Sequence, residues 1–267
     1  MVWLIVTAVH QAARSQEARP EAFDSVLWAQ ASVEHDAAYL QAYRAAHMAL
    51  DRARKDKKWT AAIEQRSGYE RLPPAVILDI DETVLDNSPE MAEQVRNGSR
   101  QGLWEDWVGR ESARPLPGAI EFTRYAAANR VEVIYVTNRD ATLKEATRRT
   151  LTALGFPLQR GADSLYLLGE KPEWGSDKGT RRQAIAMRYR ILLLIGDDLG
   201  DFISGARVSP EERRRLVERY AGRWGERWIV LPNPMYGSWE DALYGYQSEL
   251  SRDERLRLEH GYLRGME

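Results

Sequence analysis

The sequence predicts an α/β protein: a doubly wound parallel sheet with a smaller, mostly helical cap domain. From residue 74 onward, short apolar runs rich in β-branched residues alternate with helical patterns. This alternation implies right-handed crossovers and a parallel sheet covered by helices on both faces. Polar residues gather directly after three of the runs, where ligands bind in such sheets. The insertion after the first run is too long for a simple βα loop and indicates the cap.

The N-terminal segment, residues 1–22, is expected to be signal-like or disordered. An apolar run from Val2 to Val9 precedes a zone of small residues, as in a signal peptide, but no Lys or Arg comes before it. A plain helical turn is the alternative. We expect a periplasmic or secreted protein if the segment is a signal, and a cytoplasmic one if it is not. No run approaches the roughly 18 apolar residues that a membrane span needs.

Residues 23–72 are expected to form a helical segment that packs with the cap. From Phe23 to Lys58 apolar and aromatic residues recur every three or four positions, which predicts one long amphipathic helix or two short ones. We interpret this aromatic stripe as core packing rather than as a cofactor-binding face.

The α/β core is assigned to residues 73–87 and 117–240. It begins after Pro73-Pro74 with the buried-type run 75–81. Further strands are expected at 131–136, 164–168, 191–195 and 228–231, and helices at 119–129, 141–154 and 179–189. The cap insertion is expected at 88–116 and C-terminal helices at 241–267.

Composition excludes several classes of function. The 38 Lys and Arg residues against 40 Asp and Glu give a net charge of -2, which provides no positive field for a nucleic acid polymer. The chain has no cysteine, so thiolate zinc sites, a phosphocysteine route and a thioether lipid anchor are absent. None of the four histidines lies in an Arg-His-Gly setting, which disfavours a phosphohistidine route.

Carboxylates at two strand ends predict a metal site. Asp79 and Asp81 are two residues apart in an extended run, so both side chains should project to one side at the edge of the sheet. Asp197 follows another strand and adds an oxygen ligand. A site that has only a few protein carboxylates and leaves coordination positions open to water suits Mg²⁺. A lone Asp-x-Asp is often only a solvated turn. Four polar clusters in order, the fourth at Lys178, favour the functional interpretation.

At these motifs the chain resembles the haloacid dehalogenase (HAD) superfamily, and within it the class C acid phosphatases, the branch of bacterial lipoprotein phosphatases and 5′-nucleotidases. The resemblance runs from about Val26 to the C-terminal helix. The stretches that carry it are DIDETVLDNSP at 79–89, VTNR at 136–139, SDKGTR at 176–181, GDDLGDF at 196–202 and LPNPMYGSWE at 231–240.

The resemblance implies a HAD-like, Rossmannoid core and a phosphoric monoester hydrolase. Asp79 would attack phosphorus to form an aspartyl-phosphate, and Asp81 would protonate the leaving alkoxide and then activate water. Mg²⁺ would be held by the Asp79 carboxylate, the Asp81 backbone carbonyl and Asp197. Metal and Lys178 would offset the repulsion between an anionic nucleophile and a phosphate dianion. Thr137 is implied as a catalytic, phosphate-binding residue.

Further residues receive secondary roles from the same resemblance. Asn138 joins Thr137 and Lys178 in binding phosphate, and Asp198 and Asp201 are accessory carboxylates. Trp104 in the insertion and Tyr236 after the last strand match the family's aromatic clamp on a nucleobase. This implies a preference for nucleoside monophosphates, because two aromatic faces can sandwich any base.

Three departures from the family pattern are visible. The lipobox cysteine is missing, Asp198 stands where Asn is expected, and a longer stretch before Lys178 leaves Lys171 as a second contender for the phosphate-binding lysine. The partner is expected to be a small phosphomonoester, and the sequence leaves monomer and homodimer open. The alternative function is a non-catalytic phosphoacceptor or storage protein on the same scaffold.

Overall fold

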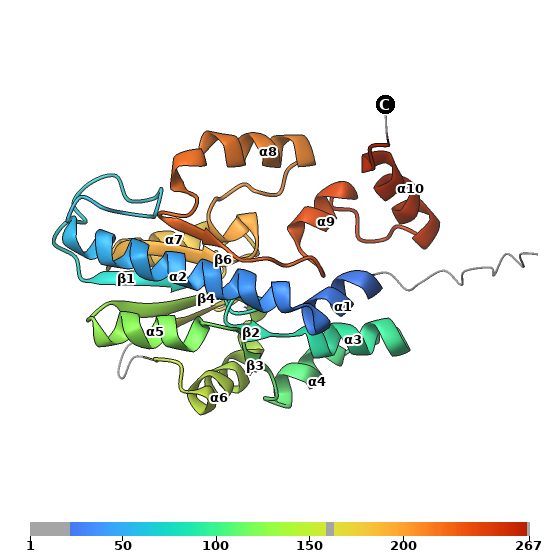
Figure 1. Cartoon of the computed structure of the whole chain (residues 1–267), viewed down its shortest axis with the longest axis horizontal. Helices are drawn as coiled ribbons and strands as arrows, with labels where there is room; N and C mark the ends of the chain where they lie inside the picture. Colours follow the sequence, from blue (N-terminus) through green and yellow to red (C-terminus); the bar gives the residue numbers. More distant parts are fainter. Residues whose placement is uncertain (1–21, 159–162, 266–267) are drawn as a thin grey trace, which may run out of the picture.

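A five-stranded parallel sheet forms the centre of the molecule (Figure 1). The computed structural model describes residues 22–158 and 163–265. The strand order is β5-β4-β1-β6-β7, and every neighbouring pair is parallel. The strands are β1 (Pro74–Leu78), β4 (Glu132–Asp140), β5 (Leu165–Leu168), β6 (Arg190–Gly196) and β7 (Trp228–Val230). The predicted fold class and all five predicted strands are confirmed.

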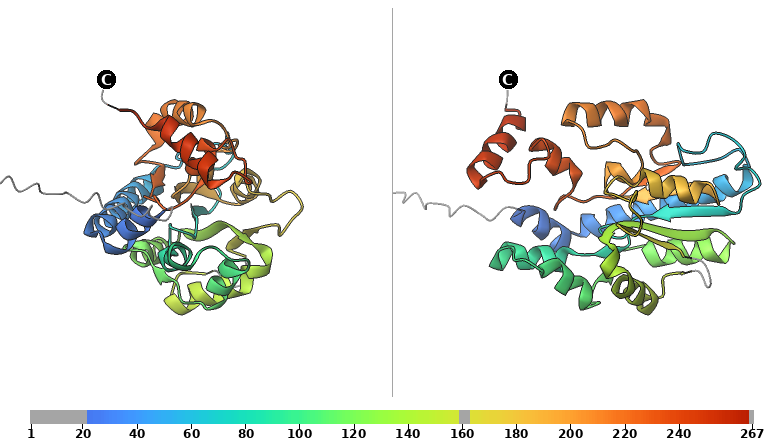
Figure 2. Two further views of the ribbon diagram at one scale, coloured as in Figure 1. Left: turned by 90° about the vertical axis from the view of Figure 1, so that its right-hand side faces the viewer. Right: turned by 180° about the vertical axis from the view of Figure 1, so that it is seen from behind.

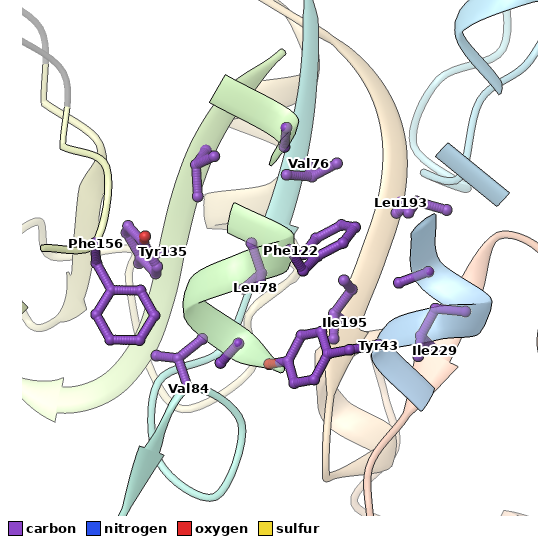
Figure 3. Close-up of a cluster of buried hydrophobic side chains, with 14 of the residues drawn as sticks. Tyr43, Val76, Leu78, Val84, Phe122, Tyr135, Phe156, Leu193, Ile195 and Ile229 are labelled. Atoms are coloured by element: carbon purple, nitrogen blue, oxygen red, sulfur yellow. The ribbon is translucent and has the colours of Figure 1, made fainter. Parts of the chain in front are cut away.

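Alternate residues of the central strand enter two different cores. Val76 and Leu78 of β1 belong to one buried cluster, whereas Ala75 and Ile77 belong to the other. This period of two is what a strand buried on both faces requires. The first core lies beneath α2 (Val33–Lys55), α5 (Ala119–Ala128) and α6 (Lys144–Leu154), and Figure 3 shows part of it, with Tyr43 and Phe122 beside strand side chains. The second lies beneath α7 (Gly179–Ala186) and α8 (Pro210–Arg219).

The N-terminal helical pattern forms two helices of unequal length. α1 (Phe23–Ala31) and α2 meet at Ser32, which has an extended backbone and whose hydroxyl accepts a hydrogen bond from the Glu34 backbone N–H at 3.1 Å. An N-terminal cap of this kind starts a new helix. The aromatic stripe is core packing, as predicted. It also reaches the site, because Tyr39 and Tyr43 donate to backbone carbonyls in the loop that follows β1.

The segment after β1 is mostly helical. It contains α3 (Ser88–Asn97) and α4 (Leu103–Gly109), and its two ends pair as a short antiparallel two-stranded sheet of β2 (Leu85–Asp86) and β3 (Arg114–Pro115). α1 packs against α3. Near the C-terminus come α9 (Ser238–Leu243) and α10 (Arg252–Tyr262), and both lie at the same end of the molecule as α3 (Figures 1 and 2). The domain boundaries inferred above stay predictions.

Within residues 22–158 and 163–265, no helix combines the length and the apolar character that a bilayer span needs. The signal-like run Val2 to Val9 lies outside the described residues.

Candidate active site

The ends of β1 and β6 bring three carboxylates together. The two strands pair in parallel as far as Leu78 and Ile195, and the Asp79 backbone N–H donates to the Ile195 carbonyl at 3.0 Å. Asp79 and Asp197 therefore lie side by side at the carboxyl edge of the sheet. Asp201 follows in a short 3₁₀ turn, Leu199–Asp201. One carboxylate oxygen from each of the three lies within 4.8 Å of the others.

A buried lysine contacts this cluster. Lys178 stands at the start of α7 and is 6% exposed. Its Nζ donates to Asp79 Oδ1 at 2.5 Å and to Asp201 Oδ1 at 2.6 Å. Lys171, the other contender, is exposed and lies over the Trp174 ring at 4.5 Å. The geometry therefore places Lys178, and not Lys171, at the cluster.

The electrostatics of the cluster call for a further cation. Burial raises the pKa of Asp79 to about 7, although the ammonium of Lys178 opposes that shift. Burial also raises the pKa of Asp197 well above its usual range, and the charges of Asp201 and Asp79 add to the effect. Burial opposes the charging of Lys178, but the two carboxylates outweigh it and raise its pKa.

Three carboxylates and one ammonium leave two negative charges uncompensated when all four groups are ionised. A divalent cation would balance them, and an all-oxygen donor set is the kind that hard divalent cations prefer. The residues present therefore fit a divalent metal ion.

The side chain of Asp81 faces a separate set of partners. Arg139 approaches both of its oxygens, with Nη2 2.7 Å and Nε 3.0 Å from Oδ1 and Nε 3.3 Å from Oδ2. Asn87 Nδ2 donates to Oδ1 at 2.9 Å, and the Thr137 hydroxyl donates to Oδ2 at 3.3 Å. The carboxylate keeps 17% of its surface exposed, so it is firmly held yet still accessible.

The carboxylate cluster, Lys178, Asp81 and Arg139 line one cavity of about 740 Å³. Its wall includes nine of the predicted site residues: Asp79, Asp81, Trp104, Asn138, Lys178, Asp197, Asp198, Asp201 and Tyr236. Thr137 is fully buried just behind the wall. The cavity thus has a charged floor at the strand ends, with Trp104 of α4 and Tyr236 of the segment after β7 also in its wall.

Comparison with known proteins decides the family. The family model described as HAD superfamily, subfamily IIIB (acid phosphatase) matches residues 6–239. The chain belongs to this family. A solved class C acid phosphatase from Bacillus anthracis is 33% identical, with a TM-score of 0.80, and the match covers 92% of this chain and 98% of that one. The tungstate-bound structure of the class C acid phosphatase from that organism is 32% identical, with a TM-score of 0.81 and the same coverage.

The protein is therefore an acid phosphatase, a phosphomonoester hydrolase of the HAD superfamily. The resemblance stated from the sequence motifs is confirmed, and so is the assignment as an enzyme. The carboxylate cluster fits the divalent metal that HAD phosphatases use.

Asp198 has a structural explanation in this acid phosphatase. Its carboxylate accepts the backbone N–H groups of Gly200 and Ser238, at 2.8 and 2.9 Å, and the Ser238 hydroxyl. Its own N–H donates to Asp201 Oδ2 at 2.9 Å, which completes a capping box around the 3₁₀ turn. Asp198 therefore ties β6 to α9, and the added charge has its own hydrogen-bond donors.

The phosphatase site also contains residues to which sequence reasoning gave no role. Arg139 and Asn87 lie within the motifs, yet the sequence does not predict their contacts with Asp81. Arg181 is fully buried and donates to the Thr137 carbonyl at 2.5 Å and to Asn138 Oδ1 at 2.6 Å, which fixes the polar end of β4. The place of Arg181 within the motif at 176–181 was the available signal, but its partners Thr137 and Asn138 lie more than 40 residues away in the sequence.

Proposed function

We propose that this acid phosphatase hydrolyses phosphomonoesters through an aspartyl-phosphate on Asp79, with Mg²⁺ as its metal and nucleoside monophosphates as preferred substrates. The contact between the buried Asp79 carboxylate and Lys178, at the floor of a large cavity, carries the proposal. It is a carboxylate with a cationic partner, within reach of a ligand that enters the cavity.

The reaction divides into two displacements at phosphorus. A carboxylate oxygen of Asp79 attacks phosphorus, the ester P–O bond breaks, and the departing oxygen takes a proton from Asp81. Water then attacks the phosphorus of the aspartyl-phosphate while the Asp81 carboxylate takes its proton. Inorganic phosphate leaves, Asp79 is restored, and Asp81 is ready for the next cycle. Acid and base catalysis of this kind contributes about 10²–10⁴-fold.

The charged groups around Asp79 make the first step feasible. Two unit charges about 4 Å apart interact by about 4 kcal/mol at an effective dielectric of 20, so an anionic nucleophile needs help to approach a phosphate dianion. Lys178 supplies one positive charge. The Asp79 and Asp197 carboxylates with the Asp81 carbonyl would hold the metal, which supplies further charge neutralisation when bound. Thr137 and Asn138 would contribute at the phosphoryl oxygens, as charge spreads in the transition state.

The substrate preference rests on the aromatic residues of the cavity. Trp104 and Tyr236 come from separate segments and line the same space as Asp79. A base stacked between them would gain about 1–3 kcal/mol for each stack, whatever its identity. Export, which depends on residues 1–22 acting as a signal, stays a prediction made from the sequence, and monomer and homodimer both stay open.

Release of inorganic phosphate tests the proposal. Its rate is measured for nucleoside monophosphates, sugar phosphates and p-nitrophenyl phosphate, each in the presence of Mg²⁺, of other divalent ions or of chelator. Steady turnover that chelator abolishes and Mg²⁺ restores is expected, with the lowest KM for nucleotides. Asp79→Asn should be inactive, and Asp253→Asn on the exposed part of α10 serves as the matched control. Turnover by Asp79→Asn would overturn the nucleophile assignment.

A further inference from the structure

Several hydrogen-bond donors hold the side chain of Asp81 in one orientation. Arg139 is 3% exposed and reaches both oxygens of Asp81. Its remaining nitrogen, Nη1, donates to Thr147 Oγ1 in α6 at 3.1 Å. The guanidinium is therefore fixed from two sides. A bidentate arginine and carboxylate pair defines direction as well as charge.

Two of the three residues that donate to Asp81, Asn87 and Arg139, are themselves contacted by α4. Trp107 Nε1 donates to Asn87 Oδ1 at 2.8 Å, and Asn87 in turn donates to Asp81. Trp104 presents its ring to the Arg139 guanidinium at 5.4 Å, within the range of a cation–π contact. One short helix therefore reaches Asp81 by two independent routes.

The geometry points to Arg139 and Asn87 as positioning residues for Asp81, each kept in place by one tryptophan of α4. This inference rests on the proposed function, in which Asp81 gives a proton to the leaving oxygen. A proton donor must lie within hydrogen-bond reach of that oxygen. Without these partners the partly exposed Asp81 side chain would sample several rotamers, and only some of them aim at the substrate. The insertion thereby contributes to the chemical step as well as to the cavity wall.

The leaving group reveals this role. Nitrophenolate departs without protonation, whereas the alkoxide of glycerol phosphate needs the proton. The value of kcat/KM covers events up to the departure of the leaving group, so it reports the acid step for each substrate. Misplacing Asp81 should therefore lower kcat/KM for glycerol phosphate much more than for p-nitrophenyl phosphate. A loss of fold or of phosphate binding would lower both alike.

The experiment compares both substrates in Trp107→Phe and Arg139→Lys, with Mg²⁺ present. Trp107→Phe removes the indole N–H that orients Asn87 together with part of the ring. Trp224→Phe makes the same truncation and loses an N–H bond to Val217 outside the cavity lining, so it is the matched control. We expect kcat/KM for glycerol phosphate to fall about tenfold further than for p-nitrophenyl phosphate in both test variants, a part of the 10²–10⁴-fold that acid catalysis supplies. The inhibition constant of inorganic phosphate should change less than about threefold.

Asp81→Asn separates the inference from the function on which it rests. If Asp81→Asn shows the leaving-group dependence but Trp107→Phe and Arg139→Lys do not, the positioning role is wrong and the proposed function survives. If Asp81→Asn lowers kcat/KM equally for both substrates, the assignment of Asp81 as the acid is wrong. Equal losses for both substrates in Arg139→Lys and Trp107→Phe, with weakened phosphate binding, would also overturn the inference.

Discussion

Asp197→Asn should change the stability of the metal-free and metal-bound protein in opposite senses. In the metal-free protein this substitution removes one charge from a cluster of three carboxylates that a single ammonium compensates. With the metal bound, the same substitution removes a ligand. The variant is therefore expected to be more stable than the natural sequence in chelator and to lose most of the stabilisation that divalent ions provide.

The magnitude follows from the distances in the cluster. With Asp79, Asp201 and Lys178 ionised, Asp197 faces a net single negative charge within 4.8 Å. Such a pair repels by about 3 kcal/mol at an effective dielectric of 20. The asparagine NH₂ would face either the Thr83 hydroxyl or the Asn233 amide, which now donate to Asp197, and losing one hydrogen bond costs about 1 kcal/mol. The net gain is about 2 kcal/mol, or about 4 °C in Tm.

Thermal unfolding at pH 8, in chelator and in excess Mg²⁺, is the assay. Metal at 100 times its Kd should stabilise the natural sequence by about 2.7 kcal/mol and raise its Tm by about 5 °C. Asp197→Asn should have a higher Tm than the natural sequence in chelator, and excess Mg²⁺ should raise that Tm by less than about 1 °C. Asp198→Asn is the matched control, because its carboxylate is bound by Gly200 and Ser238, and it should keep the metal response. A lower metal-free Tm for Asp197→Asn, together with an intact metal shift, would refute the reasoning.

Four further predictions use other parts of the site. In chelator, the Tm of the natural sequence should fall relative to that of Asp79→Asn as pH rises from 5 to 8. The folded-state pKa of Asp79, about 7, lies above the unfolded value of about 3.9, so the stability that Asp79 contributes at low pH is lost as it ionises. A constant Tm difference between the two proteins would contradict this. Tyr43→Phe strands the Thr83 carbonyl, now bound at 2.6 Å, and should lower the free energy of unfolding by about 1–3 kcal/mol in urea titrations; an unchanged midpoint would count against it. Lys178→Met leaves Asp79 without its cation and should lower kcat at least about 100-fold; near-normal kcat would exclude its role. Tyr236→Ala should raise the nucleotide KM about tenfold and leave that of glycerol phosphate unchanged; equal changes would exclude the stack.

The sheet was predictable because its strands carry a local signal. Ala75, Val76, Ile77 and Leu78 are all apolar, which is the mark of a strand buried on both faces. The cluster was predictable for a related reason, since residues that follow parallel strands meet at one edge. That rule and the order of the motifs were enough to predict that Asp79 and Asp197 lie close together. Helix α8 lay outside the prediction, because its residues are mostly charged and none is buried.

The contacts that hold Asp81 could not be read from the sequence. Arg139 lies 58 residues from Asp81, and nothing in the chain between them specifies that the guanidinium turns toward it. The role of Asp198 was hidden in the same way, because its partner Ser238 is 40 residues away. The sequence supplies the residue type and the strand end. The direction in which the Asp81 and Asp198 side chains point depends on contacts with segments that follow them in the sequence.

Chemical trapping of the covalent intermediate tests the central claim most directly. The enzyme with Mg²⁺ and a phosphomonoester is quenched with acid during turnover, the acyl phosphate is reduced with borohydride, and the peptide that follows β1 is sequenced by mass spectrometry. We expect modification at Asp79 alone, none in Asp79→Asn, and accumulation of the intermediate in Asp81→Asn. Modification at another residue, or turnover with no trapped phosphoryl group in any of these proteins, would contradict that claim.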